Sequence, residues 1–140
     1  ITGFWKGIGS FGTAVLVARN NIVHDNLGWG LIATGRSFAD FSNNVVYHNG
    51  NCGVAPWSTE ARGRIINNII ANNVAALAGG GMVLRDTVKA NIVHNTVAHN
   101  ETTATAGNAF SPGFPNFSNP QPAGISSRAR ARSESRPMSM

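Results

Sequence analysis

Charged side chains and cysteine are scarce in this chain of 140 residues, and their scarcity excludes several classes of protein. Asp, Glu, Lys and Arg together make up 12% of the residues. With Cys52 as the single cysteine, the chain can form neither an internal disulfide framework nor a zinc site built only from cysteines. Because no apolar run is long enough for a signal peptide or a transmembrane helix, we expect no membrane span.

The positive charge of the chain lies mostly near its C-terminal end. The formal net charge is +5, of which residues 1–125 supply +2 and residues 126–140 supply +3. A basic surface spread over a folded domain, which is the electrostatic signature of nucleic-acid binding, is therefore not indicated. The segment SSRARARSESRPMSM is polar and low in complexity, so residues 126–140 are predicted to be a disordered basic tail.

Asparagine and glycine are abundant instead, and the asparagines reveal an internal repeat. The pattern N-N-[IV]-[IV]-x-x-N occurs four times, with His94 and Thr96 as departures in the last copy. The copies are NNIVHDN from residue 20, NNVVYHN from 43, NNIIANN from 67 and HNTVAHN from 94, so they lie 23, 24 and 27 residues apart. Apolar runs that contain glycine follow the first three copies: GWGLIAT (28–34), NCGVAPW (51–57) and GGGMVLR (79–85).

The repeat predicts strands rather than helices. Its apolar residues come in short runs rich in Val and Ile, interrupted every few residues by turn formers. Helical solenoid repeats are also longer, at roughly 33–47 residues. Each repeat therefore holds about three short strands, and the period is that of a coil of parallel β-structure.

In the paired segments NNIVHDN–GLIAT, NNVVYHN–GVA and NNIIANN–GGGMVL, the chain resembles the right-handed parallel β-helix proteins, the superfamily that contains pectate lyases and many bacterial surface proteins. The resemblance covers roughly residues 13–110. It implies an all-β solenoid of about four to five rungs, each with three short strands. We expect this domain to span residues 1–110 and to be followed by an irregular segment rich in Pro and Phe over residues 111–125.

A β-helix explains why each copy combines asparagine with isoleucine or valine. Equivalent residues of successive rungs stack about 4.8 Å apart, so an asparagine at a bend can bond with the asparagines above and below it. Between two such ladders, Val23, Val46, Ile70 and Val97 are predicted to form an inward aliphatic column. The first predicted ladder is Asn21, Asn44, Asn68 and Asn95, and the second is Asn26, Asn49, Asn73 and Asn100.

Several side chains are candidates for binding a substrate. Trp29 and Trp57 follow ladder positions, and exposed aromatic faces bind sugar rings. His48 belongs to a column just before the second ladder, in which Asp25, His48, Asn72 and His99 share one position of the repeat and would line one solvent surface if they point outward. Tyr47 stands one residue before His48. Arg62 and Arg64 are the kind of base that polysaccharide lyases use; Arg85 and Lys89 are of the same kind. No catalytic residue can be matched to those enzymes.

No cofactor or metal is expected. Gly7, Gly9 and Gly12 form G-x-G-x-x-G, but the β-branched run that follows does not open a helix, so a dinucleotide site is disfavoured. Each repeat offers at most one acid, whereas a Ca²⁺ site needs several oxygen ligands. Bound Ca²⁺ is expected only if the chain is a lyase.

Two functional hypotheses remain open from the sequence. In the first, the chain is a non-catalytic β-helix segment of a secreted or cell-surface bacterial protein, with a structural or glycan-binding role. In the second, it is a fragment of a polysaccharide lyase or another carbohydrate-active enzyme that acts on extended uronate polysaccharide. Both imply that a polysaccharide is the partner to test and that the chain, which opens at Ile1 without a Met, is part of a larger parent chain.

Overall fold

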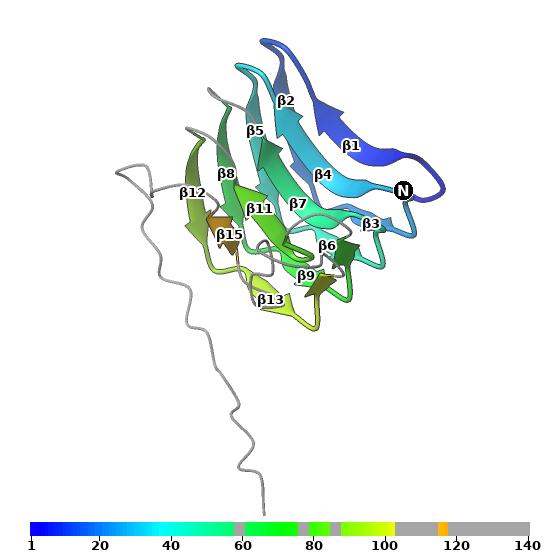
Figure 1. Ribbon diagram of the computed structural model, residues 1–140. Coiled ribbons are helices and arrows are strands. Elements are labelled where there is room, and N and C mark those ends of the chain that lie inside the picture. Colours follow the sequence, from blue (N-terminus) through cyan, green and yellow to red (C-terminus); the bar gives the residue numbers. More distant parts are fainter. Residues whose placement is uncertain (58–60, 76–78, 85–87, 103–114, 118–140) are drawn as a thin grey trace, which may run out of the picture.

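The computed structural model describes residues 1–57, 61–75, 79–84, 88–102 and 115–117, and in these residues the chain is all-β. Parallel strands form a coil with three sides, each of which is one sheet (Figure 1). Sheet A contains β1 (Lys6–Ser10), β4 (Trp29–Thr34), β7 (Cys52–Trp57), β11 (Met82–Leu84) and β15 (Pro115–Phe117). Sheet B contains β2 (Val15–Arg19), β5 (Phe38–Ser42), β8 (Arg62–Ile66) and β12 (Lys89–Val93). Sheet C contains β3 (Ile22–His24), β6 (Val45–Tyr47), β9 (Ile69–Ala71) and β13 (Thr96–Ala98).

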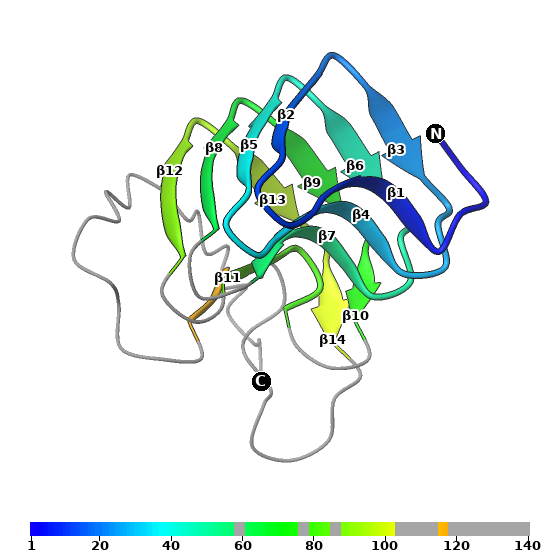
Figure 2. The same cartoon turned by 90° about the horizontal axis from the view of Figure 1, so that it is seen from above.

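The order of the strands confirms the predicted parallel β-helix with three strands in each turn. The chain visits sheets A, B and C in succession and then returns to sheet A one strand further along the coil, as the view in Figure 2 shows. A small fourth pair, β10 (Val74–Ala75) with β14 (Glu101–Thr102), is also parallel. The coil makes about three turns, so the expectation of four to five rungs is slightly too high.

The segment predicted to be irregular contributes one described strand. Residues 115–117 form β15, which pairs in parallel with β11 and extends sheet A. The rest of residues 111–125 and the whole predicted tail over residues 126–140 lie outside the described residues.

The core fills the inside of the coil, and each sheet supplies one column of side chains to it. Because side chains alternate between the two faces of a strand, every second residue points inward. The column predicted between the ladders is present, with Val23, Val46 and Ile70 fully buried and Val97 packed against the cluster. The other two columns are Leu31, Val54 and Met82 from sheet A, and Ala18, Phe41 and Ile65 from sheet B.

The predicted asparagine ladder is present at both bends. In the first ladder, each Nδ2 donates to the Oδ1 of the next asparagine at 3.1, 3.0 and 2.9 Å. In the second ladder, the same three bonds are each 2.9 Å long. Each of these Oδ1 atoms also accepts a backbone N–H from the ladder asparagine of the preceding turn, a contribution that the sequence did not predict. The ladder therefore joins the backbone as well as the side chains of neighbouring turns.

A left-handed residue precedes every ladder asparagine. The φ angles of these eight residues lie between 50° and 58°, in a region that asparagine, aspartate and histidine tolerate better than other residues that carry a side chain. The doublets N-N, D-N and H-N thus combine a residue that turns the chain with one that bonds to the next turn. The left-handed residues are Asn20, Asn43, Asn67 and His94 at the first bend and Asp25, His48, Asn72 and His99 at the second, and the latter four are exposed.

Candidate functional site

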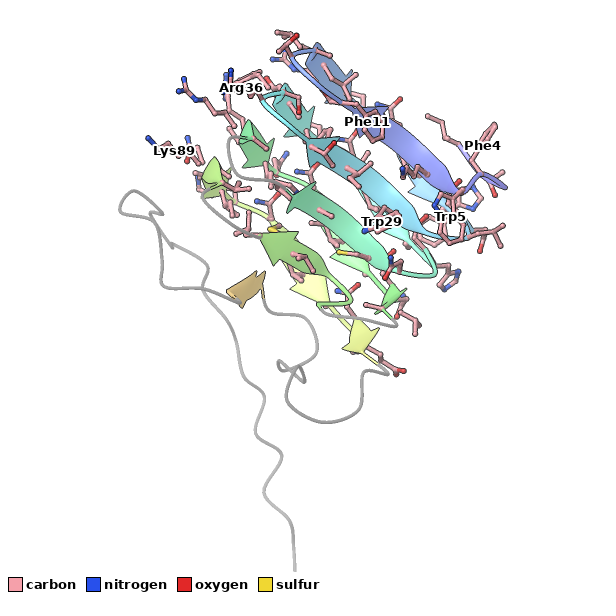
Figure 3. The ribbon with its side chains drawn as sticks, turned by 45° about the horizontal axis from the view of Figure 1, so that its top comes forward. Phe4, Trp5, Phe11, Trp29, Arg36 and Lys89 are labelled. Atoms are coloured by element: carbon pink, nitrogen blue, oxygen red, sulfur yellow. The ribbon has the colours of Figure 1, made fainter. Side chains whose placement is uncertain are left out.

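An aromatic surface lies on the outer face of sheet A, over β1 and β4. Lys6 and Trp29 occupy the same position of successive turns, and Trp5 directly precedes β1. The rings of Trp5 and Trp29 meet edge to face, with their centroids 6.1 Å apart. Figure 3 shows Phe4, Trp5, Phe11 and Trp29 on the side of the coil that carries these two strands. We call Phe4, Trp5, Lys6, Phe11 and Trp29 the aromatic face.

A lysine ammonium stands between two rings of the aromatic face. Lys6 Nζ lies 4.9 Å from the ring centroid of Phe11 and 5.7 Å from that of Trp29, within the range of a cation–π interaction. The Phe11 ring lies against the strand because residue 9 is glycine: a Cβ there would be 2.5 Å from the ring. Lys6 is thereby held beside the rings while its charge remains available to a ligand.

The rings of the aromatic face are unusually open to solvent. Phe4 is 59%, Trp5 61% and Phe11 47% exposed. A soluble protein rarely leaves several large apolar side chains together in water unless they contact a ligand or a partner. This surface is therefore the strongest candidate for a binding site in the described part of the chain.

The residues predicted from the sequence fall on different faces of the coil. Trp29 belongs to the aromatic face, whereas Trp57 ends β7 and pairs through its backbone with Thr34, and its side chain lies outside the described residues. Tyr47 and His48 lie at the second bend. Arg62 and Arg64 lie on sheet B. One compact site cannot contain all of them.

At the second bend, rings and a carboxylate form a small surface cluster. Tyr47 stacks on His24 with centroids 4.9 Å apart and meets His48 edge to face at 5.0 Å. Asp25 contacts Nδ1 of His24 and lies 3.7 Å from Nδ1 of His48. The cluster offers hydrogen-bonding groups next to a ring, but in the described part of the chain no group of three or more His, Cys, Asp or Glu side chains is arranged to hold a metal ion.

The outer face of sheet B is basic and surrounds one buried carboxylate. Asp40 pairs with Arg19 and lies 3.8 Å from Arg64, while Ser42 donates a hydrogen bond to it. Burial acts to raise the pKa of Asp40, but the hydrogen bonds from Ser42 and Arg19 and the charges of Arg19 and Arg64 outweigh burial and lower it below 3.8. Arg62 and Lys89 are exposed neighbours in the same sheet. Asp40 is paired with the two arginines and is therefore not free to act as a base.

This arrangement makes the acid stability of the coil depend on Asp40. A carboxyl whose pKa is lowered by folding stabilises the fold above its unfolded pKa, and this contribution is lost as the pH falls through the folded pKa. We expect acidification from about pH 6 to about pH 2.5 to reduce the free energy of unfolding of the wild type by about 1 kcal/mol more than that of Asp40→Asn, a modest difference because both guanidinium groups are half exposed. Urea unfolding at the two pH values measures it, and an equal loss in both proteins would contradict the assignment.

The one cysteine is not a candidate nucleophile. Cys52 is buried, and burial raises the pKa of its thiol to about 12 despite hydrogen bonding with the backbone of Val54 and Val83. A thiol with such a pKa stays neutral at physiological pH. Cys52 is therefore a small buried apolar side chain of sheet A, packed with Ile32, Ala55 and Val83.

Phe4, Trp5, Lys6 and Phe11 are the residues of the aromatic face that were not predicted as binding residues from the sequence. They precede the first copy of the asparagine motif, so the repeat did not mark them. The available signal was the spacing: Lys6 stands 23 residues before Trp29, which is the first interval of the repeat. Extending the period backwards would have placed these residues beside Trp29.

Comparison with known proteins supports the fold. A family model described as a right handed beta helix region matches residues 3–126. No curated protein and no solved structure matches the chain. Among the described residues, no helix is long and apolar enough to cross a membrane.

Proposed function

The chain belongs to the right-handed β-helix family, and from that premise we propose that it is a non-catalytic segment of a secreted or cell-surface bacterial protein that binds an extended glycan on the outside of its coil. The observation that carries the proposal is the aromatic face, in which Phe4, Trp5 and Phe11 are exposed and the Lys6 ammonium lies over the rings of Phe11 and the partly buried Trp29. The family alone supports the fold and leaves the ligand open, because one fold serves many functions.

The chemistry of the aromatic face suits a sugar. One side of a pyranose ring is lined with C–H groups that pack on an aromatic ring, while its hydroxyl groups need hydrogen-bond partners. Trp5 and Trp29 supply ring surfaces at a right angle to each other. Lys6 supplies three donors for hydroxyl or carboxylate oxygens at the centre of the same surface.

The acids of the described chain favour binding over catalysis. Asp25 contacts His24, and Asp40 is paired with Arg19. Glu101 lies in β14, away from both. The lyase alternative draws its support from exposed Arg62, Arg64 and Lys89 on sheet B. Incubation with uronate polymers and Ca²⁺ distinguishes the binding proposal from the lyase alternative, because β-elimination forms an unsaturated product that absorbs ultraviolet light. Steady release of this product by the purified chain would favour the lyase.

Removal of one ring of the aromatic face is expected to weaken glycan binding. Trp5→Ala deletes an exposed ring that supports no buried side chain, so the variant should fold normally. We expect about a tenfold rise in Kd, equivalent to about 1.4 kcal/mol, because tryptophans at the centre of a binding surface commonly carry this much energy. A glycan array on the wild type identifies the ligand, and titration calorimetry then compares the two proteins.

Ile69→Ala serves as the matched control. Ile69 is also an exposed apolar residue, but it lies in β9 on sheet C, a different side of the coil from the aromatic face on sheet A. Its removal should leave Kd unchanged. Equal binding by Trp5→Ala and the wild type, or the absence of any glycan ligand on the array, would overturn the proposal.

A further inference from the structure

The lysine and arginine side chains of the described residues gather on one side of the coil. Lys6 belongs to the aromatic face, and the remaining five lie in strands of sheet B or directly before one. All five are exposed, and Figure 3 shows Arg36 and Lys89 on the side of the coil away from Trp5. We call these five residues the basic face: Arg19, Arg36, Arg62, Arg64 and Lys89.

The basic face carries a surplus of positive charge. Asp40 is the one acidic residue in the strands of sheet B, so the formal sum is 5 − 1 = +4. Glu60, Arg85 and Asp86 stand close to β8 and β12 in the sequence but lie outside the described residues; together they add −1, so the sum stays positive. The net charge of +2 over residues 1–125 therefore understates the charge of this one surface.

Two cations of the basic face stand opposite each other in adjacent strands. Arg62 of β8 and Lys89 of β12 are register partners, and adjacent strands lie about 4.8 Å apart. The same row continues with Phe38 and Val15 rather than with an acid. Like charges directly opposite each other destabilise a sheet. A bound anion relieves this repulsion, which favours a ligand-binding role for the pair.

Asp40 positions two further guanidinium groups in the neighbouring row. Arg19 Nη2 lies 2.5 Å from Asp40 Oδ2, and Arg64 Nη1 lies 3.8 Å from the same oxygen. The aspartate side chain is 5% exposed, whereas those of Arg19 and Arg64 are 51% and 52% exposed. Each guanidinium has five N–H donors, so one carboxylate leaves most of them available to a ligand. Asp40 thus orders the two arginines without neutralising the surface.

We propose that the basic face binds a polysaccharide that carries sulfate or phosphate esters. Such an ester presents three terminal oxygens, so one group can accept hydrogen bonds from Arg62 and Lys89 together, whereas a carboxylate has two oxygens. The planar guanidinium groups of Arg19 and Arg64 offer paired donors to further esters along the polymer. Because the basic face lies on sheet B, this binding does not depend on the aromatic face of sheet A.

The surroundings of the basic face favour a polysaccharide over a nucleic acid. Proteins that bind single-stranded nucleic acid stack the bases on aromatic rings, whereas the outward rows of sheet B contain one ring, the partly buried Phe38. Duplex DNA is read by an element that enters a groove, and sheet B is one side of a continuous coil.

Dextran derivatives test the class of ligand because they share one backbone and differ in the anion attached to it. In titrations of the full chain at low salt, dextran sulfate or dextran phosphate should bind about tenfold more tightly than carboxymethyl dextran of the same degree of substitution. The tighter of the two esters identifies the natural group. Equal affinity for carboxymethyl dextran, or tighter binding of duplex DNA, would overturn the proposal.

Charge-removing variants test whether the ligand lies on the basic face. The double variant Arg62→Gln/Lys89→Gln should raise the Kd of dextran sulfate about tenfold, because it removes two exposed charge contacts. It should also reduce the slope of log Kd against log salt concentration, since fewer counterions are released on binding. Both side chains are exposed, so the urea midpoint should equal that of the wild type.

Lys6→Gln is the matched control, because it makes on the aromatic face the substitution that Lys89→Gln makes on the basic face. Lys89→Gln alone should raise the Kd of dextran sulfate about threefold, and Lys6→Gln should leave it unchanged. Equal weakening by the two single variants would place the sulfated ligand on the aromatic face and overturn the proposal. Trp5→Ala tests the aromatic face separately, so either surface can fail without the other.

Discussion

Replacement of Asn68 by leucine is expected to remove a large part of the stability of the coil. Asn68 is 1% exposed, and its Oδ1 accepts hydrogen bonds from the backbone N–H of Asn44 at 2.9 Å and from Asn44 Nδ2 at 3.0 Å. Its own Nδ2 donates to Phe41 O at 2.8 Å and to Asn95 Oδ1 at 2.9 Å. Leucine has the same branching and a somewhat larger side chain, so it creates no cavity and the loss comes mainly from the polar groups left behind.

The size of the loss follows from those groups. Asn68→Leu leaves the backbone N–H of Asn44 and one N–H of the Asn44 amide without partners inside the coil, and Phe41 O keeps only its bond within the sheet. Each unsatisfied buried group costs about 1–3 kcal/mol, so the two donors of Asn44 should lower the free energy of unfolding by about 2–6 kcal/mol. Since a domain of this size is stable by only about 5–15 kcal/mol, urea unfolding followed by circular dichroism should show a large shift of the midpoint.

Asn91→Leu is the matched control because it makes the same substitution at an exposed strand position. Asn91 lies in β12, on the outer face of sheet B, next to Arg64. A surface change of this kind usually alters stability by no more than about 0.5 kcal/mol. If the two variants unfolded at the same urea concentration, the ladder would have no special energetic role.

The ladders and the core column could be predicted because both depend on the repeat. A residue that recurs at one position in every copy lies above its equivalent in the next turn. The repeat therefore predicts the contact between Asn44 and Asn68, which neither copy alone would indicate. The left-handed conformation could also have been predicted, because each of these residues is the first of an N-N, D-N or H-N doublet. The repeat predicted the ladder position of the second residue of each doublet, whereas the left-handed conformation of the first residue was not predicted.

The aromatic face could not be predicted in the same way, because its contacts do not repeat. Trp5 meets Trp29 from a segment that precedes the first asparagine motif, and its equivalent one turn later is not aromatic. The pairing of Asp40 with Arg19 and Arg64 likewise joins three turns that carry different residues at neighbouring positions. Such contacts depend on the register of neighbouring strands. The spacing of the asparagine motif does not fix that register, because the loops between the copies differ in length.

A column of glycines is the second feature on which the coil depends. Gly7, Gly30, Gly53 and Gly81 hold equivalent positions in sheet A. Each lies against the aliphatic column and the second ladder, and a Cβ at any of them would meet a valine or isoleucine methyl group at 2.5–2.7 Å. The backbone there has no positive φ, so glycine is required for space rather than for conformation.

Gly30→Ala is expected to destabilise the coil by about 3 kcal/mol, at the upper end of the usual cost of overpacking a core. The new Cβ would lie 2.5 Å from Val46 Cγ1, 2.9 Å from Asn49 Nδ2 and 2.7 Å from Gly53 O. The last of these is backbone in the adjacent strand, and Asn49 is fixed in the second ladder by its bond to Asn73. None of the three can move without disturbing the next turn, so the strain spreads along the coil instead of relaxing locally.

Gly9→Ala distinguishes this crowding from a general intolerance of side chains on sheet A. Its Cβ would also meet a neighbour at 2.5 Å, but that neighbour is the ring of Phe11, which is half exposed and free to swing outward. Stability should therefore change by less than about 1 kcal/mol, while the ring leaves its place beside Lys6 and the affinity for glycan falls. Equal destabilisation by Gly9→Ala and Gly30→Ala in urea unfolding would show that rigid neighbours are not what makes Gly30 indispensable.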